Sequence, residues 1–292
     1  QRCYEVCPGE SYFCQSRSIN YESVMNDVTI VSALFNIHRE GMDGRKWEEY
    51  LRWFDIFLKL KCPMILFVSK DVQDFIEERR LAVPTTVITQ EIEEIPYYYL
   101  KDDLDKIIES DDYKEMIADP SRIECQHSMY SIIQYSKFEW LKQAADENPY
   151  NSKHFFWMDA GSSRFFEGYD TALDYPSPDA VESLNEMEDS FLIQMNMEFY
   201  KDLAEADEIP EEYLLDNRSF ILGSMFGGGP ESIKKVSTYM KELLENLMIK
   251  KGFVNNEQIA FGYLVKKYPD DFAVFERYTG KHMELFTELG KR

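Results

Sequence analysis

The sequence has no long hydrophobic run. No uninterrupted apolar stretch reaches the roughly 18–20 residues that a membrane-spanning helix needs, and the N-terminus does not have the pattern of a signal peptide. We therefore expect no membrane span within this chain. A cytoplasmic location is favoured. An anchor removed from upstream of Gln1 would instead place the protein in a Golgi or secretory lumen, so the compartment stays open.

Basic residues are scarce. The sequence has 32 Lys and Arg against 54 Asp and Glu, which gives a formal net charge of −22. Binding to a nucleic-acid backbone needs clustered positive charge, so we expect no nucleic-acid partner. An anionic substrate would need either a bridging cation or a local cluster of Lys and Arg side chains.

Cysteine is also sparse. Three of the five cysteines, Cys3, Cys7 and Cys14, lie close together at the start of the chain. No His accompanies them at zinc-finger spacing, so we do not expect a zinc site. A disulfide within this segment would indicate an oxidising compartment, and this alternative stays open.

Two common nucleotide-binding signatures are missing. The first strand-like segment, residues 28–35, is followed by neither GxGxxG nor GxxxxGK[ST], which argues against a dinucleotide-binding fold and a P-loop. The segment ends instead in a polar loop that contains Asn36 and Arg39. Such a loop suits nucleotide binding, but many other α/β proteins begin in the same way.

The residues that are abundant indicate a folded α/β protein. Hydrophobic residues make up 44% of the chain and aromatic residues 15%, which excludes a disordered chain. We interpret residues 1–26 as a polar N-terminal extension and residues 27–292 as one domain. Strand-like and helix-like patterns alternate from the start of that domain, which predicts βαβ units and a mainly parallel sheet flanked by helices. The segments are the strands 28–35, 64–68 and 85–88 and the helices 47–60 and 74–80.

The most informative stretch is the apolar run His154–Met158 and the residues that follow it. Asp159 comes directly after the run, and Gly161, two serines and Arg164 follow. Ligands of open α/β sheets bind at the carboxyl ends of the strands, and a carboxylate there can bind Mg²⁺ or Mn²⁺. An ordinary strand end with an Asx-turn explains the pattern equally well.

Two other segments have both a structural and a functional interpretation. Lys137 lies in a long helix predicted over residues 125–145, where it is either a surface lysine or a partner for a phosphate. The tyrosines of residues 97–99 either pack in the core or line a carbohydrate site.

The C-terminal half adds two strands, a glycine run and a helix start. We expect a strand at residues 191–197, for which an antiparallel direction is one alternative, and an edge strand at 272–275. Gly227, Gly228 and Gly229 follow another strand-like segment, where the backbone either passes close to a ligand or turns sharply. Asn256 is placed to cap a helix whose first turn contains Glu257 and Gln258, and structural capping explains that pattern without function.

Together, these landmarks resemble the HtrL/YibB-like (WlaTC/HtrL) family, with the features of a GT-A glycosyltransferase. The resemblance runs in order from about residue 28 to residue 276. It rests on residues 28–39, the 47–60 helix, 85–88, 135–138, 157–161, 221–224 and the 256–258 helix start.

The resemblance implies a GT-A-like, mixed and mainly parallel sheet and a metal-dependent transfer of a sugar. The donor would be a nucleotide-diphosphosugar, with a UDP-sugar favoured, and the acceptor a hydroxyl of a glycan. The cofactor would be Mn²⁺ or Mg²⁺ bound to Asp159, although Gly161 stands where such enzymes have the second Asp of Asp-x-Asp. His282 or Ser162 would then supply another ligand.

The resemblance also implies roles for further residues. Glu257 is the expected general base if the reaction inverts configuration, and Gln258 would contact the sugar; a retaining reaction needs no such base. Rival interpretations are a non-catalytic sugar- or nucleotide-binding protein with a degenerate Asp-x-Asp motif, an interaction protein and a nucleotidyltransferase. The expected donor-binding residues are Ser32, Ala33, Phe35, Asn36, Arg39, Lys137, Asp159, Gly161, Gly223, Gly227, Gly228 and Lys281.

Overall fold

A computed structural model describes residues 27–165, 176, 178–196, 200, 201, 206 and 208–277. The N-terminal extension, Lys281 and His282 lie outside these residues, so the predictions made for them stay predictions.

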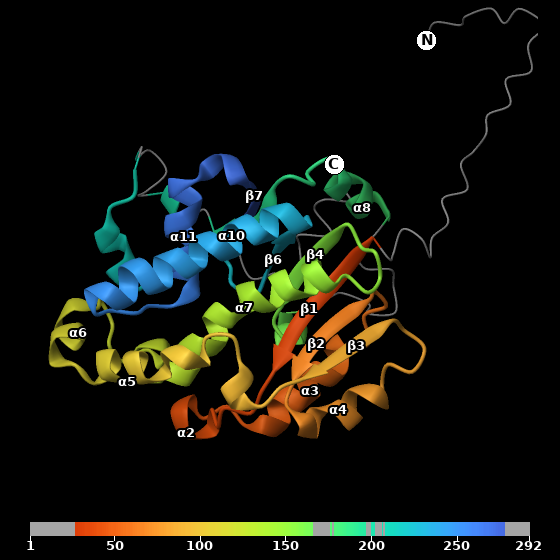
Figure 1. Cartoon of the computed structure of the whole chain (residues 1–292), viewed down its shortest axis with the longest axis horizontal. Coiled ribbons are helices and arrows are strands. Elements are labelled where there is room, and N and C mark those ends of the chain that lie inside the picture. The colour runs from red at the N-terminus through yellow and green to blue at the C-terminus, as the bar shows by residue number, and fades with distance from the viewer. Residues whose placement is uncertain are drawn as a thin grey trace, which may run out of the picture.

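One seven-stranded sheet organises the described chain, in the order β3-β2-β1-β4-β6-β5-β7 (Figure 1). Strand β6 runs antiparallel to its neighbours β4 and β5, and the other pairings are parallel. The expected mixed, mainly parallel sheet is therefore confirmed. The strands are β1 (Val28–Leu34), β2 (Met64–Val68), β3 (Thr85–Thr89), β4 (His154–Met158), β5 (Phe191–Asn196), β6 (Met225–Gly228) and β7 (Phe272–Arg277).

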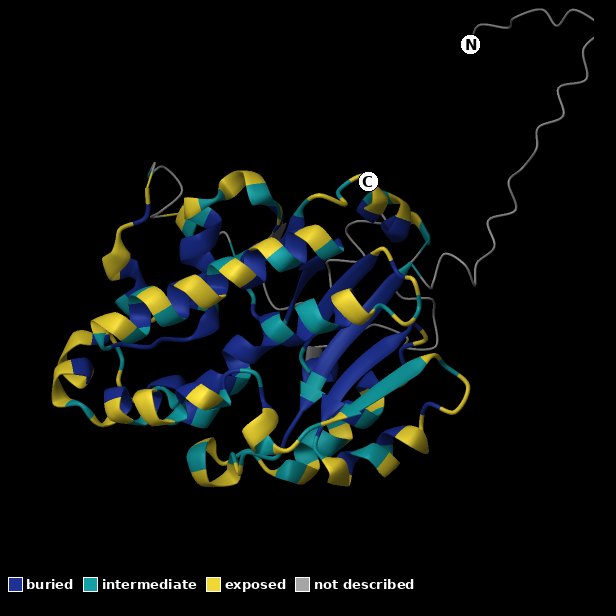
Figure 2. Cartoon of the chain, viewed as in Figure 1, coloured by how far each residue is buried: buried dark blue, intermediate teal, exposed yellow. Residues whose placement is uncertain are grey.

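Helices cover both faces of the sheet, and each face has its own apolar core. Helices α7 and α10 lie side by side on one face (Figure 1), where α5, α6 and α11 join them, and α3, α4 and α8 pack on the other. The central strands are buried because helices cover both of their faces, whereas the edge strand β3 is half-buried (Figure 2). The helices are α2 (Glu40–Asp43), α3 (Trp47–Phe57), α4 (Lys70–Glu77), α5 (Lys101–Glu109), α6 (Asp111–Met116), α7 (Ser128–Glu147), α8 (Pro178–Asn185), α10 (Pro230–Glu242) and α11 (Glu257–Lys267).

Strands β5 and β7 form one end of the sheet. The predicted edge strand at 272–275 is confirmed as β7. The antiparallel direction considered for residues 191–197 is confirmed for the pairing of β5 with β6. The pairing of β5 with β7 is parallel.

Gly227 and Gly228 of the glycine run are the last two residues of strand β6, and Gly229 is the N-cap of α10. A Cβ atom on Gly227 would lie 2.1 Å from the Phe155 carbonyl oxygen of β4, and one on Gly228 would lie 2.6 Å from the Ser190 carbonyl oxygen. A side chain at either position would therefore collide with the backbone of a neighbouring segment. Close packing of β6 accounts for Gly227 and Gly228, so neither a ligand nor a sharp turn is needed to explain these two glycines.

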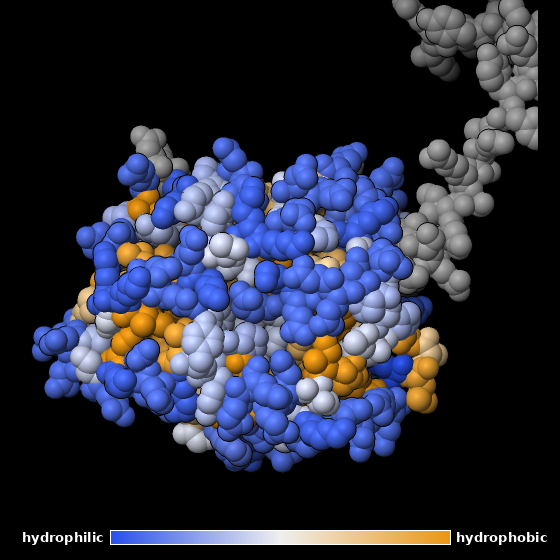
Figure 3. Space-filling view, viewed as in Figure 1, coloured by the Kyte–Doolittle hydropathy of each residue, from blue (hydrophilic) through white to orange (hydrophobic). Residues whose placement is uncertain are grey.

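The tyrosine segment divides between core and surface. Tyr97 is 1% exposed and belongs to the core, whereas Tyr99 is 61% exposed and donates a hydrogen bond to Glu245. Most of the face seen in Figure 3 is hydrophilic. No helix among the described residues is both long and apolar enough to span a membrane.

Candidate functional site

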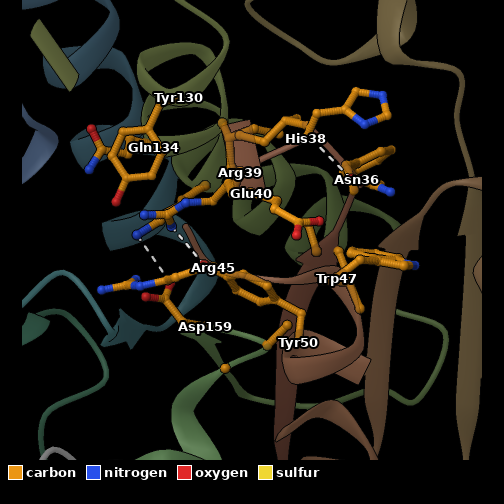
Figure 4. A pocket seen from close by; sticks show the side chains of 18 of the residues that line it. Asn36, His38, Arg39, Glu40, Arg45, Trp47, Tyr50, Tyr130, Gln134 and Asp159 are labelled. Atoms are coloured by element: carbon orange, nitrogen blue, oxygen red, sulfur yellow. Dashed lines mark hydrogen bonds and ion pairs between the residues drawn. The ribbon is translucent and has the colours of Figure 1, made fainter. Parts of the chain in front are cut away.

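A cavity of about 450 Å³ opens at the carboxyl ends of β1 and β4. The two strands pair in parallel, so the loop that follows each one reaches the same edge of the sheet. Residues 33–41 form one wall, residues 159–161 a second, and one side of α7 a third. Ligand sites of open α/β sheets lie at this edge, so the cavity is the candidate site (Figure 4).

Asp159 is held on one side and open on the other. Its Oδ1 accepts a hydrogen bond of 2.7 Å from the Trp157 indole and lies 3.1 Å from Lys137 Nζ. The Asp159 side chain is 32% exposed, and within the described chain no hydrogen bond reaches its Oδ2. The carboxylate therefore has a fixed orientation and one oxygen available to a ligand.

Lys137 is the central cation of the site. Only 7% of the residue is exposed, so the surface-lysine interpretation is wrong. Its Nζ donates to Glu257 Oε1 at 2.7 Å and to the Gly223 carbonyl at 3.1 Å, besides its contact with Asp159. Burial by itself would lower the pKa of Lys137, but the charges of Asp159 and Glu257 outweigh it and raise that pKa.

Glu257 lies behind Lys137 and does not line the cavity. It is fully buried, and its Oε2 has no hydrogen-bond partner among the described residues. Burial raises the pKa of Glu257, although Lys137 opposes that rise. A general base must reach the acceptor hydroxyl, so this arrangement does not suit the expected role. Glu257 instead positions Lys137.

Gly223 and Gln258 pack beside this ion pair. A Cβ atom on Gly223 would lie 2.5 Å from Glu257 Oε1 and 2.7 Å from Gln258 Cγ. The glycine therefore permits α11 to approach Lys137, and it does not line the cavity. The predicted cap is confirmed, because Asn256 Oδ1 accepts hydrogen bonds from the backbone of Gln258 and Ile259.

The loop after β1 places two arginines at the cavity. Arg39 donates a hydrogen bond of 2.7 Å to the Tyr50 hydroxyl, pairs with Asp43, and lies 4.5 Å above the centre of the Tyr130 ring. Arg45 lies 3.6 Å from the same Asp43. Figure 4 shows Arg39, Arg45 and Asp159 gathered on one side of the cavity.

Several cavity residues were not predicted from the sequence. Arg164 follows Gly161 and stacks 4.8 Å from the centre of the Trp53 ring. On α7, Tyr130 and Gln134 occupy positions i−7 and i−3 from Lys137. This helical spacing places them on one face with Lys137 and was a signal that could have identified them. The unpredicted cavity residues also include Arg45, Trp47 and Tyr50.

The structure brings seven of the predicted donor-binding residues together at the cavity, and four others do not line it. Ser32 is buried beneath the site and does not line it. Gly223, Gly227 and Gly228 pack against other parts of the chain, and Lys281 lies outside the described residues. The seven that line the cavity are Ala33, Phe35, Asn36, Arg39, Lys137, Asp159 and Gly161.

The fit of a divalent metal rests on Asp159 alone within the described chain. Its open Oδ2 is a hard oxygen ligand of the kind that Mg²⁺ and Mn²⁺ accept. The described residues contain no group of three or more His, Cys, Asp or Glu side chains that could hold a metal. Ser162 Oγ is buried and has no hydrogen-bond partner among these residues, and His282 lies outside them.

Three solved structures are similar over most of the chain, all at low identity. The crystal structure of mouse xyloside xylosyltransferase 1 in its apo form matches 85% of this chain and 85% of its own, at 11% identity and a TM-score of 0.42. A glycosyltransferase involved in glycosylation of the major capsid of PBCV-1 matches 90% and 89%, at 12% identity and a TM-score of 0.38. The inositol-1-phosphate CTP transferase of T. maritima matches 90% and 96%, at 14% identity and a TM-score of 0.37. These TM-scores are low, so strand order and register establish the fold.

Sequence comparison gives a firmer result. Protein HtrL of Escherichia coli (strain K12) is 20% identical over 278 residues, which cover 89% of this chain and 92% of that protein. The model of the family described as "Bacterial protein of unknown function (HtrL_YibB)" matches residues 26–289. The chain therefore belongs to the HtrL_YibB family.

Proposed function

We propose that this protein is a glycosyltransferase that takes a nucleotide-diphosphosugar donor, with a UDP-sugar favoured, and transfers the sugar to a hydroxyl of a glycan acceptor. One observation carries the proposal: a cavity lined by four basic side chains and two acidic ones, Glu40 and Asp159, lies at the carboxyl edge of β1 and β4 in a chain of net charge −22. In so acidic a chain, an anionic substrate needs either a local cluster of this kind or a bridging cation.

The chemistry requires stabilisation of the diphosphate that leaves as the bond from sugar to phosphate breaks. Arginine side chains around the cavity would stabilise that charge. A divalent metal, when bound, would stabilise the same leaving group, and Asp159 Oδ2 would be its ligand from the described chain. Lys137 holds the other oxygen and so fixes the carboxylate.

The geometry says less about how the acceptor hydroxyl would be activated than about how the donor would be bound. If the reaction inverts configuration, a carboxylate must reach the acceptor hydroxyl. Among the described residues, the carboxylates that line the cavity are Glu40 and Asp159. A retaining reaction would need no such base.

The test measures turnover of a donor panel. UDP-, GDP- and CMP-sugars are incubated with the protein, with and without Mn²⁺, and the released nucleotide is quantified. We expect release from one nucleotide family, raised by a glycan acceptor, and a loss of about 100-fold or more in Asp159→Asn. Asp111→Asn is the matched control because its side chain is 96% exposed on α6, and it should retain full turnover. Turnover in Asp159→Asn equal to that of the control would contradict the proposal.

A non-catalytic nucleotide- or sugar-binding protein is the second candidate. Gly161 favours it, because this residue stands where the resemblance places a second Asp. Donor binding without release of nucleotide, under every acceptor and metal condition, would support this candidate over the transferase.

A further inference from the structure

The aromatic wall of the cavity contains one ring on which nothing stacks. Five aromatic side chains line the cavity. Within the described chain, no aromatic ring or cation packs on the half-buried ring of Trp47, whereas the other four rings are already engaged. These four are Phe35 and Trp157, which stack on Trp140, Tyr50, which packs edge-on against Trp53, and Tyr130, which lies beneath Arg39.

Trp47 is nevertheless held in place. It is the first residue of α3, and part of its side chain packs against the apolar core on that side of the sheet. The remainder lines the cavity. A flat ligand group could therefore stack on an indole that the core already orients, and nucleobases stack on aromatic side chains in this way.

Glu40 adds a carboxylate to the same cavity, and among the described residues no cation pairs with it and no donor reaches it. Arg39 is its neighbour in the sequence but pairs with Asp43 instead. The other carboxylate of the cavity wall, Asp159, contacts Lys137 at 3.1 Å. Glu40 therefore differs from Asp159 in that its negative charge is not paired.

The unpaired carboxylate limits which part of a donor can lie beside it. An ionised carboxylate accepts hydrogen bonds and donates none, and it repels a phosphate placed next to it. The group at Glu40 should therefore be neutral and rich in hydroxyls. A ribose fits, because its adjacent 2′- and 3′-hydroxyls can donate to the two carboxylate oxygens, and acidic side chains bind a ribose hydroxyl in dinucleotide-binding folds.

These groups lie in the order in which a nucleoside diphosphate presents its parts. Figure 4 shows Glu40 between Asp159 on one side of the cavity and Trp47 on the other. In the proposed function the diphosphate lies beside Asp159. The ribose then follows at Glu40 and the base at Trp47, while the transferred sugar extends from the other end of the diphosphate.

We propose that Trp47 and Glu40, here called the nucleoside subsite, select the donor: the base stacks on the Trp47 ring, and the ribose hydroxyls donate to the Glu40 carboxylate. The inference rests on the proposed function, because it identifies how that site recognises its donor. The substrate class that follows is a ribonucleoside diphosphate sugar. A 2′-deoxyribonucleotide lacks one of the two hydroxyls and leaves a carboxylate oxygen without its donor.

The first test is calorimetric titration, in Mn²⁺, of UDP and GDP, each compared with its 2′-deoxy analogue. We expect the wild-type protein to bind the ribonucleotide at least tenfold more tightly than the analogue, and Glu40→Ala to reduce this ratio below threefold. Loss of a negative charge affects both members of a pair alike, so the ratio isolates the ribose contact. Glu48→Ala is the matched control, because Glu48 is exposed on α3 and does not line the cavity, and it should keep the wild-type ratio.

The second test addresses the stacking surface with Trp47→Leu and Trp47→Phe. Leucine keeps an apolar side chain against the core but removes the ring, so we expect nucleotide binding to weaken at least tenfold. Phenylalanine restores a ring face and should recover part of the loss.

The outcomes separate this inference from the proposed function. The same ribonucleotide preference in the wild type and Glu40→Ala, or equal nucleotide affinity in Trp47→Leu and Glu48→Ala, would overturn the nucleoside subsite and leave a transferase that holds its donor differently. Failure of every nucleotide and every nucleotide sugar in the panel to bind would overturn both.

Discussion

Two buried cations of this protein lie in very different surroundings. The Arg80 guanidinium is 5% exposed and donates to the backbone carbonyls of Leu58, Leu60 and Cys62 at 2.6 to 2.9 Å. Lys137 is similarly buried, but it contacts the carboxylates of Asp159 and Glu257. The first group of acceptors is neutral and the second is charged.

The two kinds of acceptor distinguish a structural cation, Arg80, from a cation of the candidate site, Lys137. Arg80 joins the segment before β2 to the start of β3, where it also donates to the Thr85 hydroxyl. No described residue of the candidate cavity contacts it. Lys137 lines that cavity and orients a carboxylate in it. Buried charge beside a cavity is typical of a functional site, whereas buried charge satisfied by carbonyls is typical of a structural one.

We expect the largest effect from Lys137→Met, which removes the cation of the candidate site. The substitution leaves two carboxylates facing each other without their cation, and breaking a buried ion pair costs about 3–5 kcal/mol. We expect a lower free energy of unfolding in urea and loss of nucleotide binding. The double variant Lys137→Met/Glu257→Gln should recover part of the stability, because it removes the uncompensated buried charge. Equal stability of the single and double variants would contradict the ion-pair account.

Arg80→Met should have the next largest effect, and only on stability. Each buried carbonyl left unsatisfied costs about 1–3 kcal/mol, so we expect a loss of about 3 kcal/mol or more in the free energy of unfolding. Nucleotide affinity measured well below the melting temperature should not change. Arg79→Met is the control, because Arg79 is exposed and pairs on the surface with Asp55. A loss of nucleotide affinity in folded Arg80→Met would show that the two cations do not differ as described.

Glu257→Gln should have the smallest effect and sharpens the assignment of Glu257 as a positioning residue. We expect the free energy of unfolding to fall by about 1 kcal/mol and turnover to fall about tenfold, with the KM for the donor unchanged. The pH dependence gives the direct readout. Burial raises the pKa of Glu257 in the folded state, so the folded protein binds more protons than the unfolded chain between the two pKa values.

Stability therefore falls as pH rises through that interval. The contribution of Glu257 is largest at acidic pH and is lost above its raised pKa. Glu257→Gln should remove this slope, and urea unfolding at a series of pH values measures it. An identical slope in wild type and variant would contradict the raised pKa.

The sequence predicts the framework well, because local patterns determine it. The apolar runs that become β1, β2 and β4 have strand length, and the amphipathic spacing of residues 47–60 predicts α3. Asp159 was identifiable because a buried strand ends in it. Parallel pairing of β1 with β4 then brings the loop containing Arg39 to the same edge.

The rest of the site depends on contacts between distant segments. Lys137 and Glu257 are separated by 120 positions. Helical spacing places Tyr130 and Gln134 on one face with Lys137, but α7 is buried on most of its surface, so the sequence does not show that this face lines a cavity. Gly227 faces the backbone of β4, which no local pattern reveals. Helix capping by Asn256 already accounts for the sequence pattern at residues 256–258, so nothing in that segment indicated that Glu257 contacts Lys137.

The most direct test of the central claim is a crystal structure of the protein with UDP bound. The account predicts that the nucleotide occupies the cavity between β1, β4 and α7, with its diphosphate close to Arg39 and Arg45 and beside Asp159. A nucleotide bound elsewhere on the protein, with this cavity empty, would contradict it.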